Sequence, residues 1–395
     1  MYKGSIELSL QTVKTFLRTA SFLKMKSLIH GCSEFMEKNM NCNKSLKRHI
    51  LLEETRMKQK AKLDYKPDKF GIICMKDGIY NIKSWNPEEN SWSSLIVTQV
   101  KNEIDCDFRI VIGNMLITTG EDMNAEFRKD NVTCFDLDTA KWIHIPPMNK
   151  NKLIDNIHDL GGRLFVFGYE ELRTEANDIQ QDYDNFIRLI EQYSFPRTST
   201  DNNSRFKTSI EMFNFSTRTW IDLQPPCPEI VGCAYSTTSQ NGMFYCIGLE
   251  INILHTFNVV SNEWTRKKIV RFPNIRRHYR LSDYGFVATE QYLYIIGGEY
   301  ISNTNSHGID DISSSGLYRY DLINNCWNEM AHLPTPKWII SSIVHKNKII
   351  ICPKNEGDNE VDEVLEYDIE TNKWNTLGPL PFPMENNYYS LTHLK

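Results

Sequence analysis

The stretch Leu317-Tyr318-Arg319-Tyr320-Asp321-Leu322-Ile323-Asn324-Asn325-Cys326-Trp327 contains the spacing that decides the fold. An aromatic residue is followed directly by Asn or Asp, and a Trp comes six residues after that Asn or Asp. The spacing occurs six times, starting at Trp85, Phe135, Phe213, Phe257, Tyr320 and Tyr367. Its tryptophans are Trp92, Trp142, Trp220, Trp264, Trp327 and Trp374, at intervals of 50, 78, 44, 63 and 47 residues. Because a repeat of about 50 residues is one supersecondary unit, six stacked units are expected.

Each repeat is predicted to be a short four-stranded sheet. The aromatic residue lies late on a strand with alternating side chains, as in Val364-Leu365-Glu366-Tyr367. The Asn or Asp that follows opens a turn, because its side chain can accept hydrogen bonds from the backbone two residues on. The Trp then begins the next strand, so the aromatic residue and the Trp are paired across a hairpin. We therefore assign the six tryptophans a structural role in packing and not a role in ligand contact.

An apolar strand that ends in Gly precedes most of these units. Examples run from Met115 to Gly120, Leu164 to Gly168, Phe244 to Gly248 and Leu293 to Gly298. Glycine permits a tight bend and a close approach of backbones. Together these features resemble kelch repeats, in which a Gly pair, a Tyr-Asp step and a Trp follow one another. Only Gly297-Gly298 keeps the Gly pair, whereas the first and sixth units have Cys74-Met75 and Cys352-Pro353 there.

The kelch resemblance covers about residues 70–395 and implies a closed β-propeller. The expected fold is an all-β, six-bladed kelch propeller preceded by a short α-helical N-terminal segment. The first unit lacks an innermost strand before Phe70-Gly71-Ile72-Ile73, and the strand-like stretch 387–394 has no Trp step after it. We predict that this C-terminal stretch completes the first blade, because closure removes an open sheet edge.

Composition excludes several classes of function. The 395 residues are 41% hydrophobic and 24% charged with a net charge of −5, which is ordinary for a globular protein and does not favour nucleic-acid binding. No apolar run approaches the roughly 20 residues that span a bilayer, and the N-terminus has no apolar signal core. The ten cysteines contain no Cys-x-x-Cys pair, so reduced thiols in the cytoplasm, without zinc, are expected.

Residues 1–43 differ from the repeats and show helical patterns. Leu10, Val13, Phe16, Leu17 and Ala20 lie on one helical face, followed by a second pattern from Leu28 to Met40. The order of strand and helices resembles the closing strand and last two helices of a BTB domain, and Asn41-Cys42-Asn43 resembles the start of a BACK domain. Most BACK helices and the front of the BTB domain are not in this sequence. A fragment and a natural short form are both compatible with this pattern.

Residues 44–69 are predicted to be a basic linker with a remnant of the BACK domain, because they hold nine Lys or Arg against four Asp or Glu. Basic runs can contact nucleic acid or membrane, but a solvated linker is the favoured interpretation, with no nucleic-acid or membrane partner. In the BTB–kelch family a complete BTB domain dimerises and contacts cullin-3. The resemblance therefore implies a cullin-3 partner only if a full BTB domain lies upstream.

Strand alternation places two types of loop on one face: the loop after each Gly-ended strand and the connection between blades. Insertions occur there at Glu121–Asn131, Tyr169–Thr208 and Glu299–Ser315. Long loops on a rigid scaffold commonly bind partners. In the second insertion Ile179, Tyr183, Phe186 and Ile190 share a helical face in an acidic segment. A partner-docking helix and a helix that only covers the rim both fit this pattern.

A basic and aromatic cluster on the same face is the main candidate binding site. Arginine beside an aromatic residue suits an acidic or phosphorylated target, through bidentate charge-assisted hydrogen bonds. Aromatic residues in equivalent loops could add contact area. The candidate residues are Arg271, Arg276, Arg277, His278, Tyr279, Arg280, Tyr300, Trp338, Tyr388 and Tyr389.

These features favour a binding module over an enzyme. No catalytic residue, metal ligand or cofactor motif is identified, because the ten His are scattered and no phosphate loop or nucleophile elbow occurs. The kelch-like resemblance implies a substrate-recognition part of a cullin-3 ubiquitin-ligase adaptor, which binds a target protein or an acidic peptide. Actin binding is the alternative, since other kelch proteins bind filaments. A kelch-only competitor that lacks the ligase contact is the third.

Overall fold

The computed structural model of the chain describes residues 69–394, apart from residues 77–78, 100–103, 123–129, 151, 161, 172–205, 216, 224–234, 241, 249–250, 274–278, 303–311, 355–362 and 382–387. The chain divides into two units, Met1–Asp64 and Tyr65–Lys395, and every described residue belongs to the second. The expected N-terminal helices, the basic linker up to residue 68 and the helix expected at 176–193 therefore lie outside the described residues.

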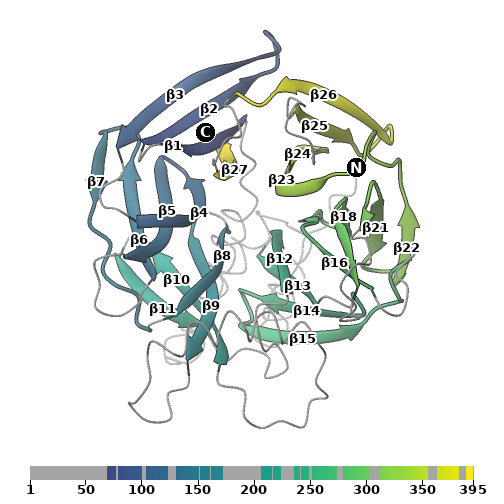
Figure 1. Cartoon of the computed structure of the whole chain (residues 1–395). Coiled ribbons are helices and arrows are strands. Elements are labelled where there is room, and N and C mark those ends of the chain that lie inside the picture. The colour runs from purple at the N-terminus through teal and green to yellow at the C-terminus, as the bar shows by residue number, and fades with distance from the viewer. Residues whose placement is uncertain are drawn as a thin grey trace, which may run out of the picture. The chain divides into compact units, whose positions relative to one another are not determined.

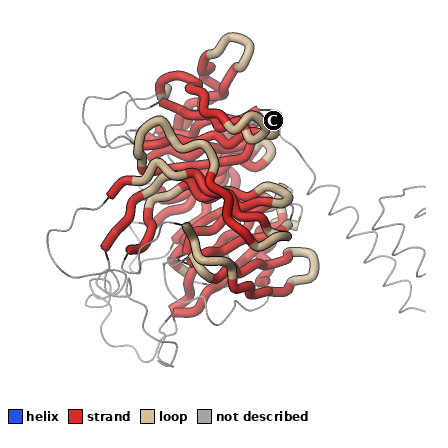
Figure 2. The backbone as a smooth tube through the Cα atoms, turned by 90° about the vertical axis from the view of Figure 1, so that its right-hand side faces the viewer, coloured by secondary structure: helices blue, strands red, loops and turns tan. Residues whose placement is uncertain are grey.

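All described elements are strands joined by turns and loops (Figure 2). They form six four-stranded antiparallel sheets and one three-stranded sheet. From the innermost strand outward, the first sheet is β27 (Tyr388–Leu394), β1 (Lys69–Lys76), β2 (Ile79–Asn86) and β3 (Ser91–Gln99). In the same order, the second is β4 (Ile104–Ile112), β5 (Met115–Asp122), β6 (Asp130–Asp136) and β7 (Lys141–Ile143). The third is β8 (Leu153–Asp159), β9 (Leu164–Glu171), β10 (Phe206–Asn214) and β11 (Thr219–Leu223).

The remaining sheets come from the second half of the chain. The fourth is β12 (Tyr235–Gln240), β13 (Met243–Gly248), β14 (Ile253–Asn258) and β15 (Glu263–Lys268). The fifth is β17 (Gly285–Ala288), β18 (Tyr292–Ile296), β21 (Leu317–Asp321) and β22 (Cys326–Glu329). The sixth is β23 (Trp338–His345), β24 (Lys348–Lys354), β25 (Glu363–Asp368) and β26 (Lys373–Pro379). The accessory sheet is β16 (Tyr279–Ser282), β19 (Glu299–Ser302) and β20 (Ile312–Ser313).

The six four-stranded sheets follow one another around a central axis, with β3, β7, β15, β22 and β26 at the periphery (Figure 1). The innermost strands contact each other in turn: β27 with β4, β4 with β8, β8 with β12, β12 with β17, β17 with β23, and β23 with β27. This unbroken circle of contacts is the architecture of a β-propeller.

The C-terminal strand β27 connects the first sheet to both of its neighbours. It pairs along its length with β1, for example Ile72 with Leu391. On one side the buried Thr392 Oγ1 accepts a hydrogen bond from Val111 N at 2.8 Å. On the other side Leu391 N donates to Ser341 Oγ at 2.9 Å. The two ends of the described chain are thereby held in one sheet.

The recurring spacing has the same geometry in all six sheets. In each case the aromatic residue and the Trp are direct cross-strand partners, as Tyr320 is with Trp327 and Tyr367 with Trp374. Their ring centroids lie 5.0 to 5.2 Å apart. The side-chain oxygen of the intervening Asn or Asp accepts hydrogen bonds from backbone amides of the turn, such as Val260 N to Asn258 Oδ1 at 2.9 Å. The turn chemistry predicted from the spacing is therefore present.

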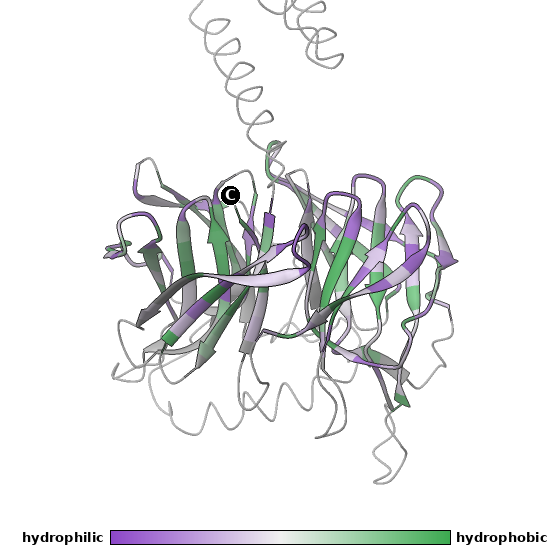
Figure 3. Ribbon diagram, turned by 90° about the horizontal axis from the view of Figure 1, so that it is seen from above, coloured by the Kyte–Doolittle hydropathy of each residue, from purple (hydrophilic) through white to green (hydrophobic). Residues whose placement is uncertain are grey.

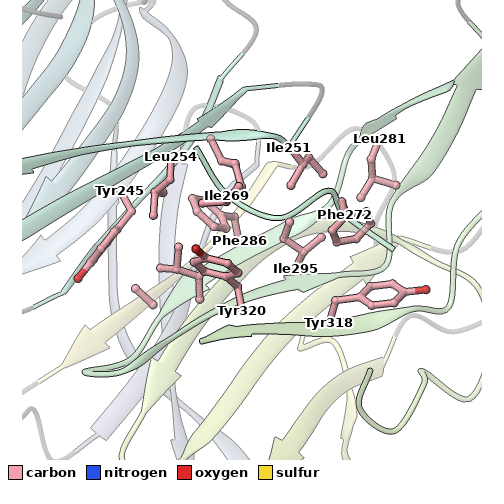
Figure 4. Packing of buried hydrophobic residues seen from close by; sticks show 13 residues of the cluster. Tyr245, Ile251, Leu254, Ile269, Phe272, Leu281, Phe286, Ile295, Tyr318 and Tyr320 are labelled. Carbon is pink, nitrogen blue, oxygen red and sulfur yellow. The ribbon is translucent and has the colours of Figure 1, made fainter. Parts of the chain in front are cut away.

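Hydrophobic clusters fill the spaces between neighbouring sheets, and apolar residues are concentrated within the strands (Figure 3). The cluster between the fourth and fifth sheets packs Phe272 against Tyr318 with ring centroids 4.7 Å apart (Figure 4). Leu281 of β16 is part of this cluster, and Tyr300 of β19 packs against it. The accessory sheet is thus anchored in the core between two sheets of the propeller.

Candidate functional site

The accessory sheet joins the two loop types that the strand alternation predicts on one face. Strand β16 comes from the connection between the fourth and fifth sheets, whereas β19 and β20 come from the insertion between β18 and β21. Leu281 of β16 is the cross-strand partner of Tyr300 of β19. The sequence indicates only a long loop in this insertion, so its pairing into strands is a finding of the structure.

A set of backbone hydrogen bonds ties a third loop to this sheet. Gly298 N donates to Lys337 O at 2.9 Å, and Ser314 N donates to Gly298 O at 2.7 Å. Ile339 N donates to Asp283 O at 2.8 Å. We call Asp283, Gly298, Ser314 and Lys337 the loop junction, because they join the insertion to the connections on either side of the fifth sheet.

The Gly297-Gly298 pair has a physical reason at this junction. Both residues have positive φ, at 61° and 90°. A Cβ atom at Gly297 would lie 2.6 Å from Lys337 O, and one at Gly298 would lie 2.6 Å from Ser282 O. No side chain fits at either distance without moving backbone. The Gly297-Gly298 pair is therefore required by the close approach of backbones at the loop junction. From the sequence alone, the pair indicates only a part of the repeat.

The candidate aromatic residues differ in how deeply their side chains are buried. Tyr300 is half-buried, and burial raises the pKa of its hydroxyl to about 12, with Tyr318 adding to the rise and a hydrogen bond with Ser314 opposing it. Tyr300 is thus a neutral hydroxyl at physiological pH. Trp338 is half-buried at the start of β23, directly after Lys337 of the loop junction. Tyr389 is only 3% exposed and packs between the first and sixth sheets, so very little of it is left for a partner.

The candidate basic residues are only partly described. Arg271 is exposed after β15, next to the buried Phe272. Tyr279 and Arg280 lie on β16, where Arg280 is the cross-strand partner of Ile301. Tyr388 begins β27 opposite Met75. Arg276, Arg277 and His278, and the insertion residues Ile179, Tyr183, Phe186 and Ile190, lie outside the described residues. The structure thus brings Tyr279, Arg280 and Tyr300 to one sheet, with Trp338 beside its junction.

A buried ion pair that no sequence pattern predicts supports another connection on the propeller. Lys152 Nζ lies 2.8 Å from Glu211 Oε1, and both side chains are fully buried. Lys152 Nζ also donates to Ser209 Oγ at 3.0 Å. Glu211 Oε2 accepts a hydrogen bond from Asn149 N at 2.8 Å, and Oε1 accepts one from Lys150 N at 3.3 Å. This network fixes the connection between the second and third sheets to β10.

The chemistry available at the loop junction is that of recognition by hydrogen bonds, aromatic contact and positive charge. Within the described ranges, no group of three or more His, Cys, Asp or Glu side chains is arranged to hold a metal ion. In the same part of the chain, no helix is long and apolar enough to cross a membrane.

Known proteins are similar to this chain in sequence and in fold. The BTB/POZ domain family matches residues 1–40. Kelch repeat and BTB domain-containing protein 2 of Ectromelia virus (strain Moscow) is 28% identical over 205 residues, which cover 49% of this chain and 33% of the viral protein. Kelch-like protein 41b of Danio rerio is 25% identical over 169 residues, covering 42% of this chain and 26% of that protein.

A third relative is kelch repeat and BTB domain-containing protein 12 of Danio rerio, 31% identical over 116 residues, or 27% of this chain and 17% of that protein. The chain spans about a third or less of the length of these relatives. The solved structure of YjhT has a TM-score of 0.52 at 13% identity and covers 80% of this chain and 99% of its own, which supports the fold alone. The BTB match at the start of the chain, the kelch relatives and the propeller together support a similarity to the kelch-like BTB proteins.

Proposed function

We propose that residues 70–395 form a six-bladed kelch propeller that recognises a target protein. The six four-stranded sheets would be its six blades, and residues 1–43 and 44–69 would be the BTB-like segment and the linker. The observation that carries this proposal is the loop junction, where Asp283, Gly298, Ser314 and Lys337 connect three loops on one face. A rigid scaffold that holds several loops together is suited to protein recognition.

The proposed target-binding residues are those that flank this junction. Arg271 is exposed, Tyr279 and Arg280 lie on the accessory sheet, and Tyr300 and Trp338 retain exposed surface. Arg276, Arg277 and His278 belong to the proposal by their position in the sequence between Arg271 and Tyr279. Guanidinium groups next to aromatic rings suit an acidic target segment. Tyr388 is retained only for its position, and Tyr389 is left out because it is buried.

The protein that contains this propeller would act as a non-enzymatic adaptor in the cytoplasm, which presents its target to a cullin-3 ubiquitin ligase. The match to the BTB/POZ family at residues 1–40 and the kelch relatives support this role. The cullin-3 contact requires a complete BTB domain. A chain without one would bind the target without delivering it, and would compete with complete adaptors.

The proposal is tested by proximity labelling in cells with the chain and its Arg276→Glu/Arg277→Glu variant. We expect specific neighbours of the chain to be lost in the variant and retained in Lys373→Glu, a matched charge reversal at an exposed residue of β26. A set of neighbours that is unchanged by the double reversal would contradict the site. Stabilisation of those neighbours when cullin-3 is depleted would support the ligase role, whereas co-sedimentation with filamentous actin would favour the cytoskeletal alternative.

A further inference from the structure

A pair of histidines lies where the first and sixth sheets meet. His345 ends β23 and is 8% exposed, whereas the half-buried His393 lies on β27. Their ring centroids are 6.0 Å apart, between innermost strands that are neighbours in the ring (Figure 1). Phe70 of β1 is the cross-strand partner of His393, and its ring centroid lies 5.2 Å from that of His345. We call Phe70, His345 and His393 the closure cluster.

The closure cluster contains contacts that hold β27 on two sides. The pairing of Phe70 with His393 belongs to the ladder between β1 and β27, which joins the two ends of the described chain in one sheet. His393 Nε2 donates a hydrogen bond to Val344 O of β23 at 2.8 Å, on the side of the sixth sheet. The protonation state of His393 therefore affects both attachments of β27, to β1 and to β23.

The charged groups on the two facing surfaces do not favour an added positive charge at the cluster. Lys348 is the cross-strand partner of His345, so the two side chains lie on the same face of the sixth sheet. Lys348 Nζ lies 2.5 Å from Glu366 Oε1, and Asp368 accepts hydrogen bonds from turn amides, so both carboxylates of this face have other partners. The described charged residues on the facing surfaces are Lys83 of the first sheet and Lys348, Glu366, Asp368 and Lys373 of the sixth. Three further titratable groups, which are neutral near pH 6, lie between the same sheets: Cys74, Cys352 and Tyr389.

Protonation of the cluster is therefore disfavoured in the folded chain. Burial lowers the pKa of His393, and the hydrogen bond to Val344 O opposes this shift. An imidazolium ion at either position would also lie beside the second imidazole ring and near the Lys348 ammonium group, and nearby like charges disfavour the charged form. A histidine released to solvent has a pKa of about 6.5. As pH falls below this value, the state with β27 released binds more protons than the closed ring does, so release becomes more favourable.

We propose that the closure cluster makes the closure of the propeller sensitive to acid: protonation of His345 and His393 below about pH 6.5 releases β27 from β1 and β23, while the other sheets stay folded. Local release is favoured over unfolding of the whole chain because it exposes both rings to water without disrupting the contacts among the other five sheets. The inference goes beyond the proposed recognition of a target, and its test needs no target.

The test follows amide hydrogen exchange of the full chain by mass spectrometry between pH 7 and pH 5.5, with labelling times corrected for the intrinsic pH dependence of exchange. Peptides from β27 report its release, and peptides from β18, in the core of the fifth sheet, report unfolding of the whole chain. The first variant is His345→Gln/His393→Gln, in which a side-chain amide can still donate to Val344 O. The control is His144→Gln, at an exposed histidine outside the cluster.

We expect the protection of β27 to fall about tenfold between pH 7 and pH 5.5, because one histidine that is protonated only on release changes the equilibrium by about this factor. The protection of β18 should change much less. The fall at β27 should persist in His144→Gln and disappear in the double variant. A fall of the same size in the double variant, or an equal fall in β18, would overturn the proposal.

Lys348→Met provides a second test, which keeps both histidines and does not depend on the folding of the double variant. It removes the ammonium group opposite His345 and leaves the Glu366 carboxylate without its cation, and both changes favour protonation in the closed ring. The protection of β27 should therefore fall less steeply with decreasing pH than it does in the chain. An unchanged or steeper fall would overturn the proposed role of the cluster.

Discussion

Tyr367 donates its hydroxyl hydrogen to Asn372 Oδ1 at 2.7 Å, across the turn that connects β25 to β26. The same oxygen accepts a hydrogen bond from Ala331 N at 2.8 Å, in the connection between the fifth and sixth sheets. Two residues later, Trp374 Nε1 donates to Ala331 O at 2.7 Å. Asn372 and Trp374 of the sixth sheet therefore each form a hydrogen bond with Ala331, in the connection that precedes this sheet. The local spacing of residues that forms the turn thus also holds the fifth and sixth sheets together.

This relationship predicts a graded loss of stability at Asn372, which has a positive φ of 55°. Asn372→Gly keeps the backbone conformation and loses both side-chain hydrogen bonds, so we expect a loss of about 1 kcal/mol. Asn372→Ala also places a Cβ atom in the left-handed region, which costs about 1 kcal/mol more. Urea unfolding of the chain and the two variants measures both steps. Equal stability of the Gly variant and the chain would contradict a contribution from the Asn372 side chain.

Two other turns have residues that fit this backbone conformation poorly. The fourth residue after the Asn or Asp has a positive φ in all six turns and is Asn in four of them. Ala140 and Arg218 occupy it in the second and third sheets, at φ of 53° and 54°. Because Asn tolerates this region better, Ala140→Asn and Arg218→Asn are each expected to raise the unfolding free energy by about 0.5 kcal/mol.

The unfolding free energy gained by Ala140→Asn or Arg218→Asn should be smaller than that lost by Asn372→Gly. Their aromatic residues are Phe135 and Phe213, which have no hydroxyl to donate to the new Asn side chain. The matched control is Ala140→Val, because a β-branched residue is worse in the left-handed region and should lower stability. Thermal unfolding of the three variants checks the order. If Ala140→Val were as stable as Ala140→Asn, backbone conformation would not determine stability at this turn.

Gly71 is predicted to be irreplaceable for the pairing of the C-terminal strand. A Cβ atom there would lie 2.5 Å from Lys83 O and 2.5 Å from Leu394 Cδ1. Leu394 could turn away, but the backbone oxygen of β2 cannot, so we expect Gly71→Ala to destabilise the chain by about 2 kcal/mol. Deletion of residues 386–395 should lower the melting temperature further, since β27 contacts both neighbouring sheets. A Gly71→Ala variant that melts like the chain would contradict the close packing of β27, β1 and β2.

How much of this structure can be predicted from the sequence depends on how far apart along the chain the interacting residues are. Tyr320 and Trp327 are seven positions apart and meet across one turn, so their spacing alone indicates the hairpin. The accessory sheet instead pairs Tyr279 with Ser302, and its strands of two to four residues are too short to show a period. Lys152 and Glu211 lie 59 positions apart, and neither carries a sequence signal of its partner. For the candidate site, the arginine cluster stays a prediction, since Arg276 and Arg277 lie outside the described residues, and the burial of Tyr389 could not be predicted from the sequence.

Neighbouring residues on β8 are expected to give opposite dependences of stability on pH. His158 Nε2 lies 3.1 Å from Thr237 Oγ1, and burial lowers the pKa of His158 to about 4. Burial raises the pKa of Asp159 to about 6, against hydrogen bonds from the amides of Gly162 and Arg163. Between pH 6.5 and 4 the unfolded chain binds more protons at His158, so that residue lowers stability as pH falls. Between pH 6 and 4 the folded chain binds more protons at Asp159, so that residue raises stability as pH falls.

Single variants separate the two contributions. Asp159→Asn should make stability fall more steeply between pH 6.5 and 4 than it does in the chain. His158→Gln, which keeps a hydrogen-bonding group near Thr237, should make the fall shallower or reverse it. Urea unfolding at intervals of half a pH unit measures the slopes. Parallel curves for the chain and both variants would show that neither residue titrates differently in the folded and unfolded chain.

The buried pair of Lys152 and Glu211 gives a prediction about the third sheet. Both side chains are fully buried, so removing one charge leaves the other without its partner in a region of low polarity. We expect Lys152→Met to destabilise the chain by about 3 kcal/mol. Glu211 would still accept hydrogen bonds from the backbone amides of Asn149 and Lys150, which limits the loss of stability. The free energy of unfolding in urea, measured at pH 7, checks the effect.

A double variant distinguishes the loss of a partner from the loss of packing. Lys152→Met/Glu211→Gln removes both charges, while the introduced glutamine side chain keeps an oxygen for the amides of Asn149 and Lys150. If the uncompensated charge is the cause, the double variant should be more stable than Lys152→Met alone, because the two effects are coupled. If the cause is the lost packing of the Lys152 side chain, the double variant should be at least as unstable as the single one, and the ion pair would have no part in fixing this connection of the propeller.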